Sequence, residues 1–516
     1  MRNAAGREIP LSVRGYGEVR PYLGPFVVQP DGRVMGRKLA AGRPLSNKVM
    51  NSLEEAMEAA GLKDGMTISF HHSLRNGDDV INMVMAAIAR SGIRDLTLAP
   101  SSFLDVNDEL VPYIEQGVVT AVETSGARGE LGKYLTNNRM EKKPTIIRSH
   151  GGRVRAIQSG ELHIDIAFIA APTCDIYGNL NGTEGPAACG SLGYAKVDAE
   201  YADTVIAITD HLVPTPIYPI SIPQTHVDYI VQVERIGDPK GISSGSLRYT
   251  SNPRDLLIAQ MAARVIERSG YFQEGFGIQL GAGAAPVATG RFLKEKMVEQ
   301  GITASLGLGG ITGPFVDLLE EGLIRTIFDV QSFDGRAIES LRKNPRHQEV
   351  DAGFYANPHN RGPLVNQLDF VVLGATEVDV DFNVNVITDS NGMIMGASGG
   401  HSDTSAGAKC TIIVAPLHRG RLPMVTEAVQ TVVTPGETVD VIVTDRGVAI
   451  NPKRMDLLEH LSGSGLPIMP IQELKNLAYE WSGRPEPIAL SDEIVGVVEY
   501  RDGTIIDVIR RPVTMD

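Results

Sequence analysis

The stretch Asp64-Gly65-Met66-Thr67-Ile68-Ser69-Phe70 returns later in the chain as Glu274-Gly275-Phe276-Gly277-Ile278-Gln279-Leu280. In each copy an acidic residue and a glycine precede a short apolar run, which predicts a turn followed by a buried strand. A helical pattern follows each strand, over 78–90 and over 290–300, and a further β-rich run follows each helix. This alternation is typical of an α/β architecture with mainly parallel strands.

Two further matches lie downstream in the same order. Asp175-x-x-Gly178-x-x-x-Gly182 resembles Asp389-x-x-Gly392-x-x-x-Gly396, and Pro223-x-x-x-Val227-Asp228 resembles Pro435-x-x-x-Val439-Asp440. The spacings between the matches agree to within a few residues in the two halves. Each match is weak by itself, but three in order indicate a duplication, and the period is far longer than that of a solenoid repeat. We therefore expect two tandem homologous α/β domains with mainly parallel sheets.

The boundaries follow from composition. The stretch Gly237–Ser246 is rich in turn-forming residues and predicts a linker, and a helical pattern over Pro253–Arg268 then opens the second half. Val495–Ile509 predicts a β-hairpin with an Asp-Gly turn. The expected division is an N-terminal arm at 1–50, a first domain at 51–245, and a second domain at 246–516 that includes the short C-terminal hairpin.

Composition excludes several classes of protein. The 516 residues contain 48 Lys and Arg against 62 Asp and Glu, a net charge of −14, which argues against a nucleic-acid partner. No signal-peptide core and no apolar window of about 18 residues is present, so we expect no membrane span and a cytoplasmic location. The three cysteines form neither a disulfide framework nor a zinc-binding spacing, and we expect no metal.

The loops that follow the strands are the expected ligand site, because ligands of such sheets bind at the carboxyl ends of the strands. The first half offers the polar and basic loop His71–Asp78. The second half offers glycine-rich loops at 281–286, at 307–313 and at 399–403. A site between the halves would therefore have one polar wall and one wall of bare backbone.

The chemistry of these loops leaves alternatives open. Gly281-x-Gly283 begins like a dinucleotide fingerprint, but Pro286 replaces the third glycine and no acidic residue ends the next strand, so nicotinamide binding is disfavoured. The glycines expose N–H groups that can hold a phosphate or an oxyanion, or they only form tight turns. Arg75 and Arg128 are candidates for carboxylate binding or are solvated surface residues.

The histidines are equally open. His71 and His72 are adjacent and point to opposite faces of an extended chain, which argues against a shared metal and leaves anion binding or acid–base work for one of them. His401 and Asp403 suggest a catalytic pair, although their spacing does not show contact. Motifs for a serine nucleophile, a zinc protease or a P-loop are absent. The residues alone thus indicate an enzyme or a sensor for an anionic ligand.

Four stretches together closely resemble the α subunit family of bacterial citrate lyase. They are Ser69–Asp78, Ala171–Asn181, Leu280–Pro286 and Ser398–Thr404, and the resemblance covers nearly the whole chain. It implies a tandem CoA-transferase-like fold and citrate:acyl-carrier-protein transferase activity, in which citrate displaces acetate from a carrier thioester. It also implies a cytoplasmic complex for citrate fermentation, with a carrier (γ) subunit, a lyase (β) subunit and more than one copy of this chain.

The resemblance also implies roles for individual residues. No cofactor is expected on this chain, because the phosphopantetheine-type thioester belongs to the carrier subunit and acetyl-CoA serves as its surrogate. Citrate is expected to contact His72, Arg75, Asn76, Ser125 and Arg128. The thioester arm is expected on Gly281, Gly283, Gly307, Gly309, Gly310, Gly399 and Gly400, and catalysis at Ser390, Asn391, His401 and Asp403.

Related enzymes that form a covalent enzyme–CoA thioester use a glutamate, and the corresponding stretches here lack one. Ser305–Thr312 contains no Glu, and Thr388-Asp389-Ser390-Asn391-Gly392 has Ser before Asn where the other branch has Glu. We therefore expect direct transfer in a ternary complex. The alternatives are an acetate CoA-transferase or acyl-CoA hydrolase of the same fold, and a non-catalytic sensor for sugar phosphates. A sensor would carry a DNA-binding helix-turn-helix, which the N-terminal arm does not show.

Overall fold

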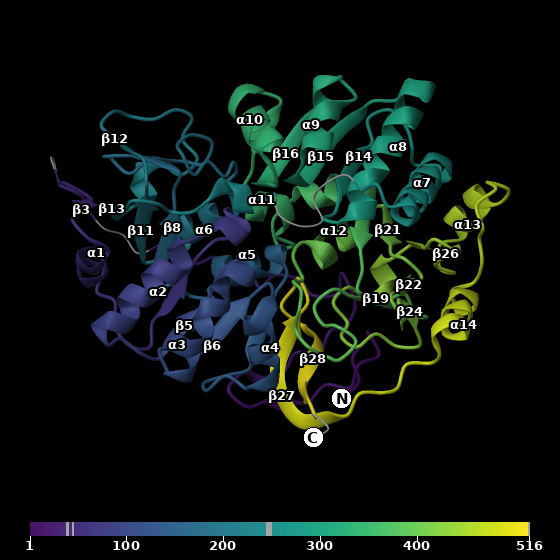
Figure 1. Ribbon diagram of the computed structural model, residues 1–516, viewed down its shortest axis with the longest axis horizontal. Coiled ribbons are helices and arrows are strands. Elements are labelled where there is room, and N and C mark those ends of the chain that lie inside the picture. Colours follow the sequence, from purple (N-terminus) through teal and green to yellow (C-terminus); the bar gives the residue numbers. More distant parts are fainter. Residues whose placement is uncertain (38–40, 44–45, 244–249, 514–516) are drawn as a thin grey trace.

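Two large sheets of mostly parallel strands form the protein, and helices cover their faces (Figure 1). The computed structural model describes residues 1–37, 41–43, 46–243 and 250–513. The first lobe is drawn mainly in purple and blue, but two yellow strands from the C-terminal end join its sheet, and the second lobe, from teal to yellow, lies beside it. None of the described helices combines the length and the apolar character needed to cross a bilayer.

The first lobe is built on a ten-stranded sheet. In order across the sheet, its strands are β28 (Ile505–Pro512), β27 (Leu490–Glu499), β7 (Thr145–Ile147), β6 (Val119–Thr124), β5 (Leu96–Leu98), β4 (Thr67–Ser69), β8 (Ile166–Ala170), β11 (Thr204–Thr209), β13 (Tyr229–Gln232) and β3 (Val49–Met50). Its helices are α1 (Leu53–Ala59), α2 (Val80–Ser91), α3 (Val111–Glu115), α4 (Gly129–Asn137), α5 (His150–Ser159) and α6 (Gly193–Tyr201).

The second lobe is built on an eight-stranded sheet. Its strands are β17 (His347–Glu349), β16 (Ile324–Ser332), β15 (Ala304–Ile311), β14 (Gly277–Leu280), β18 (Phe370–Gly374), β21 (Cys410–Val414), β25 (Val441–Val443) and β26 (Val448–Ile450). Its helices are α7 (Pro253–Arg268), α8 (Ala284–Gln300), α9 (Gly313–Glu320), α10 (Gly335–Lys343), α11 (Ala352–Ala356), α12 (His401–Gly407), α13 (Met455–Leu461) and α14 (Ile471–Ser482).

Four small sheets or hairpins complete the described elements. One three-stranded sheet consists of β10 (Leu180–Asn181), β9 (Thr173–Asp175) and β12 (Leu212–Val213). The other consists of β20 (Val384–Asn385), β19 (Glu377–Asp379) and β24 (Val425–Thr426). The two-stranded sheets are β1 (Ser12–Val13) with β2 (Gly17–Glu18), and β22 (His418–Arg419) with β23 (Leu422–Pro423).

The strand order is the same in the inner parts of both large sheets. The order β7-β6-β5-β4-β8-β11-β13 in the first matches β17-β16-β15-β14-β18-β21-β25 in the second. The pairs within both series are parallel, and strands such as β8 and β21 are buried along their whole length. Parallel strands covered on both faces read as continuous apolar runs, which explains the sequences of these two strands.

The structure corrects one of the three internal matches, the one that pairs Asp175 with Asp389. Asp175 ends β9 and accepts from the backbone of Tyr177 and from the side chain of Asn179. In the second lobe the strand in the corresponding place is β19, and its last residue, Asp379, accepts in the same way from Asn383. Asp175 therefore corresponds to Asp379 and not to Asp389. The stretch from Asp379 to Asp440 is longer than the stretch from Asp175 to Asp228, so a comparison at equal spacing selects Asp389 instead.

The C-terminal hairpin lies in a different lobe from the expected one. Strands β27 and β28 pair antiparallel, and β27 pairs in parallel with β7 of the first sheet. Residues of the N-terminal arm pack on this hairpin, and the N-terminus is marked near it in Figure 1. The hairpin at 490–512 thus belongs with the sheet of the first lobe and not with the second domain expected at 246–516. The expected boundary at 245 and 246 lies outside the described residues.

A buried ion-pair network fixes the hairpin to the first sheet. Arg148, which follows β7, donates through Nε to Glu499 of β27 at 2.6 Å and also pairs with Glu123 of β6. All three side chains are buried. Burial raises the pKa of Glu123, but the charges and hydrogen bonds of Arg148 and Lys143 together outweigh burial and hold this pKa at about 2.

Arg148→Ala should lower the free energy of unfolding by about 3 kcal/mol, because it removes the guanidinium that two buried carboxylates share. Glu123 would keep only Lys143, and Glu499 would keep Tyr16 and Arg155. Urea unfolding of the variant measures this loss. The matched control is Arg90→Ala, which breaks an exposed pair with Glu54 and should cost less than about 1 kcal/mol. Equal losses in the two variants would contradict the structural role given to Arg148.

Candidate functional site

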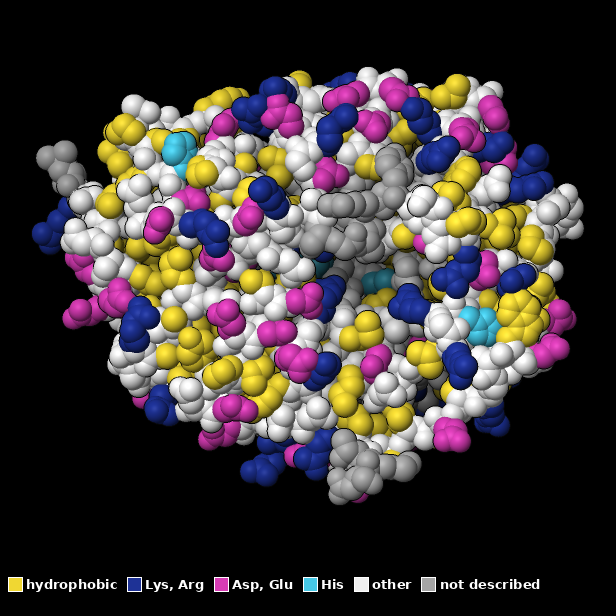
Figure 2. Space-filling view, viewed as in Figure 1, with side chains coloured by type: hydrophobic (Ala, Val, Ile, Leu, Met, Phe, Trp, Pro, Cys, Tyr) yellow, Lys and Arg dark blue, Asp and Glu magenta, His cyan; other side chains and the backbone are white. Residues whose placement is uncertain are grey.

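A cavity of about 610 Å³ opens between the two lobes. It is the hollow at the centre of Figure 2, where histidine and arginine or lysine side chains are visible within it and at its edge. The first lobe contributes polar and cationic residues to the lining, and the second contributes mainly glycine-rich backbone. From the first lobe come His72, Arg75, Ser125, Arg128, His150 and Tyr194, and from the second come Gly281, Gly283, Gly310, Gly399, Gly400 and His401.

Arg75 and Arg128 are cationic groups without a carboxylate partner. Other arginines of this lobe are held by acids: Arg153 makes two bonds to Asp198, at 2.7 and 2.9 Å. Arg75 makes no ion pair with any described residue, its Nε is buried without an acceptor, and its guanidinium lies 4.9 Å from the ring centre of Phe333. Burial, and then the nearby charge of Arg128, lower the pKa of Arg75 to about 10. Arg128 makes no ion pair with a described residue either, although the charge of Asp105 acts on it. The first-lobe wall of the cavity therefore carries two positive charges that an anionic ligand would neutralise.

The backbone at Arg75 is strained as well. Its φ is 54°, in the left-handed region that only glycine adopts readily. The residue begins a short 3-10 turn, Arg75–Gly77, at the carboxyl end of β4. Strain of this kind is held by the surrounding fold and is common at ligand sites. Asn76 lies in the same turn, outside the described lining of the cavity.

His72 is a neutral hydrogen-bond donor in this site. Ser101 Oγ accepts the backbone N–H of His72 at 3.1 Å and lies 2.6 Å from its Nδ1. With Ser101 Oγ against Nδ1, we assign the ring hydrogen to Nε2, for which the described residues offer no hydrogen-bond partner. Burial, and then the positive charges of His150, Arg75, His71 and Arg128, lower the pKa of His72 well below its usual value. His72, which is expected to contact citrate, would therefore do so as a neutral N–H group and not as a cation.

Two aromatic residues that the sequence did not single out hold the His72 ring. Tyr194 and His150 stack on it with ring centres 5.0 and 5.6 Å away. His150 begins α5, directly after the strand Thr145–Ile147, so the rule that ligands bind after parallel strands would have found it. Tyr194 lies in the first turn of α6, and no sequence pattern marks it.

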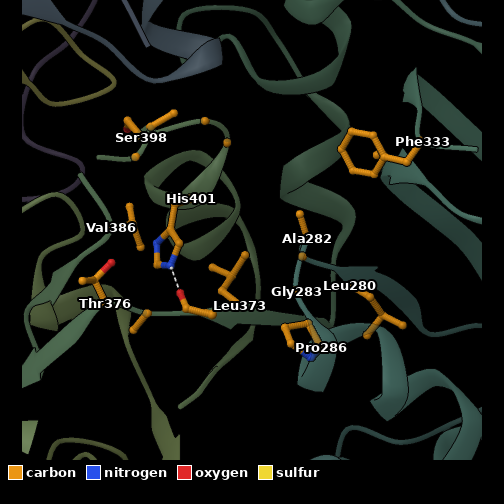
Figure 3. A pocket seen from close by; sticks show the side chains of 18 of the residues that line it. Leu280, Ala282, Gly283, Pro286, Phe333, Leu373, Thr376, Val386, Ser398 and His401 are labelled. Carbon is orange, nitrogen blue, oxygen red and sulfur yellow. Dashed lines mark hydrogen bonds between the residues drawn. The ribbon is translucent and has the colours of Figure 1, made fainter. Parts of the chain in front are cut away.

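The glycine positions fall into two groups. Gly281, Gly283, Gly310, Gly399 and Gly400 line the cavity, and the N–H groups of Gly399 and Gly400 have no hydrogen-bond acceptor among the described residues. The loop from Leu280 to Pro286 borders the cavity opposite the loop that carries Ser398 (Figure 3).

Gly307 and Gly309 are not in the described lining; both lie within β15. A Cβ at Gly307 would lie 2.5 Å from the ring of Phe315, so this glycine makes room for helix α9. The two positions serve packing, since neither borders the cavity in which a thioester arm would lie.

His401 and Asp403 do not form a pair. The His401 ring bonds to Thr434 Oγ1 at 2.7 Å through Nδ1 and to the carbonyl oxygen of Gly374 at 2.9 Å through Nε2 (Figure 3). Asp403 is fully buried and accepts from Ser149 Oγ and from the N–H of Gly151, each at 2.9 Å. Both ring nitrogens of His401 are thus occupied, and Asp403 holds the start of α5, from which His150 projects.

Acid should destabilise the protein through His401. Burial lowers its pKa to about 4, below the 6.5 of an exposed histidine, so the unfolded chain binds more protons than the folded chain between these values. The free energy of unfolding should therefore fall as pH drops from 6.5 to 4, by about 1.4 kcal/mol per pH unit for each proton. Urea titrations at several pH values should show a shallower fall in His401→Gln. The same slope in both proteins would exclude this role.

Ser390 and Asn391 lie on a turn outside the described lining of the cavity. The backbone N–H of Asn391 bonds to Asp389 across this turn, and the Asn391 side chain is exposed. A catalytic role for these two residues stays a prediction without a contact that supports it.

The lining contains a single carboxylate among the described residues. This is Asp255 of α7, which accepts from Thr250 Oγ1 at 3.2 Å. The described residues also hold one group with metal-ligand character, His163 with Asp165 and Asp203, and it does not line the cavity. The site therefore consists of cations, neutral donors and backbone amides, which suits the transfer of an acyl group to or from an anion.

The match to a family model decides the relationship. The model of "Citrate lyase, alpha subunit" matches residues 46–512. The chain belongs to the citrate lyase alpha subunit family. It is 55% identical over 464 residues to the citrate lyase alpha chain of Klebsiella pneumoniae, covering 90% of this chain and 91% of that one. It is 50% identical over 471 residues to that of Escherichia coli, covering 91% and 92%.

Solved structures agree with this membership of the citrate lyase alpha subunit family. A citrate lyase alpha subunit from Streptococcus mutans, solved in complex with citrate, superposes with a TM-score of 0.96 at 49% identity, covering 99% of this chain and 100% of that one. The structure of a Pseudomonas malonate decarboxylase hetero-tetramer matches with a TM-score of 0.61 at 16% identity, over 84% and 86%. At that identity the second match shows the shared fold alone.

Proposed function

We propose that this chain binds citrate at Arg75 and Arg128 and replaces the acetyl group of the carrier thioester with a citryl group, which releases acetate. As a member of the family the chain is a transferase of the citrate lyase complex. The observation that supports the proposal is the pair of arginines without carboxylate partners, which face a wall of backbone N–H groups across one cavity. A tricarboxylate supplies the missing negative charge, and the amides suit the oxyanions of acyl transfer.

The proposed reaction has two acyl-transfer steps. A carboxylate oxygen of citrate attacks the acetyl thioester carbonyl, the C–S bond breaks, and a mixed citryl–acetyl anhydride and a thiolate result. The thiolate then attacks the citryl carbonyl, and acetate leaves with the electrons of the C–O bond. Each step passes through a tetrahedral oxyanion, so fixed donors are the main source of acceleration. The remaining contribution is the orientation of the two reactants in a ternary complex.

The structure offers donors for these oxyanions from both lobes. His72, with its ring hydrogen assigned to Nε2, lines the cavity from the first lobe. Gly399 and Gly400, whose N–H groups have no acceptor among the described residues, line it from the second. Ser125, whose buried hydroxyl has no partner among the described residues, is placed to bind citrate beside Arg128. The thioester arm would approach along Gly281 and Gly283, because backbone without side chains lets it come close.

Direct transfer is favoured over a covalent enzyme thioester. A covalent route needs a carboxylate nucleophile in the cavity, and Asp255 is the one that the described lining offers. Incubation with acetyl-CoA, followed by hydroxylamine or borohydride treatment and mass spectrometry, should leave the chain unmodified. A modified Asp255 would instead support an acetate CoA-transferase or an acyl-CoA hydrolase.

Turnover with acetyl-CoA as the surrogate donor tests the activity itself. The purified chain should form citryl-CoA and acetate from acetyl-CoA and citrate, and citramalate in place of citrate tests the acceptor. We further propose that the chain acts with carrier and lyase subunits in a cytoplasmic assembly holding several copies of it, and that its two lobes arose by duplication. The shared strand order supports the duplication. Lack of turnover with citrate under these conditions would contradict the proposed activity.

A further inference from the structure

A second pair of arginines stands at the mouth of the cavity. Arg254, in the first turn of α7, and Arg419, at the end of β22, both line the cavity and both have exposed side chains. Neither makes an ion pair with any described residue, whereas Arg446 nearby pairs with Asp445. Figure 2 shows Lys and Arg side chains beside the central hollow. A protein with a net charge of −14 thus presents unneutralised positive charge at the entrance of its site.

The position of this outer pair is fixed by packing. Nη1 of Arg254 donates to the carbonyl oxygen of His418 at 3.0 Å, which joins the start of α7 to the residue before Arg419. The His418 ring donates to the carbonyl oxygen of Ala478 at 2.8 Å and stacks on Trp481 with ring centres 5.6 Å apart. The outer pair therefore stands on an ordered base and is not a chance meeting of mobile side chains.

The outer pair needs a different anion from the inner one. Arg75 and Arg128 supply two charges to the carboxylates at the first-lobe wall, and Arg254 and Arg419 stand on the second-lobe side with the glycine loop at 281–286. A thioester that reaches the inner wall through the mouth brings its arm with it. A pantetheine-type arm has its sulfur at one end and a phosphate at the other, so the phosphate stays near the entrance while the sulfur reacts.

We propose that Arg254 and Arg419 bind the phosphate at the far end of the thioester arm; this inference rests on the proposed function. The forked guanidinium groups match two phosphate oxygens, and a phosphate carries the charge that the rim lacks. The contact would hold the arm in register, with its thioester at the level of His72. The shared chemistry is the phosphate, whether it belongs to CoA or to the prosthetic group of a carrier protein.

Steady-state kinetics with two donors test the proposal. Arg419→Gln and Arg254→Gln should each raise the KM for acetyl-CoA on the order of tenfold, with the KM for citrate unchanged. The KM for S-acetylpantetheine, which lacks the phosphate, should be the same in the variants and the wild type. Arg421→Gln removes an exposed arginine from the same hairpin, outside the described lining, and is the matched control.

Three outcomes would overturn the proposal. They are an equal rise in KM for both donors, no rise for either, and a rise confined to the acetylated carrier protein with acetyl-CoA unaffected; the last would mean contact with the carrier surface. Calorimetry with CoA and with pantetheine keeps this test separate from turnover. If the wild type transfers no acyl group yet binds CoA more tightly than pantetheine through these arginines, the proposed function fails and the phosphate site stands.

Discussion

Arg75→Ala should raise the KM for citrate by a factor on the order of 10 to 100 and leave the KM for acetyl-CoA nearly unchanged. The reason is the loss of a charge-assisted contact with a carboxylate, worth about 1.5–3 kcal/mol, in a cavity where water replaces it poorly. Arg128→Ala should act in the same direction. Initial rates at varied citrate with saturating acetyl-CoA give the first constant, and rates at varied acetyl-CoA with saturating citrate give the second. Arg75→Lys keeps the charge and loses the fork, so its KM should lie between those of Arg75→Ala and the wild type.

The same variants separate a binding role from a structural one. Burial and the neighbouring charge of Arg128 lower the pKa of Arg75, which means that the two guanidinium groups repel each other in the empty site. Removing the charge of Arg75 breaks no ion pair, so it should not lower the melting temperature of the unliganded chain for that reason. Citrate should raise the melting temperature of the wild type and raise that of Arg75→Ala much less. An equal rise in KM for both substrates, or an equal shift of melting temperature by citrate, would contradict the assignment. Arg94→Ala, an exposed change, is the control.

Local signals predicted much of the fold. The helix expected over Pro253–Arg268 is α7 with the same bounds, because Asn252 caps it and Pro253 occupies its first position. The strands β8, β11 and β21 are continuous apolar runs, the pattern expected of parallel strands covered on both faces. The partner of the C-terminal hairpin was not predictable, since it rests on contacts such as Arg148 with Glu499, 351 residues apart. No window of sequence carries information on such a pairing.

The site was predicted in part for similar reasons. Arg75 and Arg128 follow strands of a parallel sheet, so their meeting at one edge follows from topology. Gly307 was expected beside the ligand, but it makes room for the ring of Phe315. The sequence does not distinguish the two roles, because a glycine beside a ligand and a glycine beside a packed side chain look alike. His401 and Asp403 are two positions apart in a helix, where side chains do not face each other, and their true partners lie elsewhere.

His72→Ala should lower kcat by a factor on the order of 10²–10³, the usual effect of removing one donor to an oxyanion. The KM values for citrate and acetyl-CoA should change little, because the hydrogen bond strengthens only as charge develops on the carbonyl oxygen. Ser101→Ala should lower kcat less, since it leaves the ring in place but frees Nδ1 to take the hydrogen from Nε2. Rapid-quench measurement of the first turnover separates the chemical step from product release.

The competing role for His72 is that of a general base, and His72→Gln distinguishes the two. A glutamine amide can still donate N–H to an oxyanion but cannot take up a proton at neutral pH. Partial recovery of kcat in His72→Gln relative to His72→Ala supports the donor role, and equally inactive variants would contradict it.

The pH profile of kcat gives a second measure of the role of His72. Burial, and then the surrounding His150, Arg75, His71 and Arg128, keep the pKa of His72 well below its usual value. The pH profile of the wild-type kcat should therefore show no ionisation of His72 between pH 6 and 9. This is expected of a hydrogen-bond donor that stays neutral through each step.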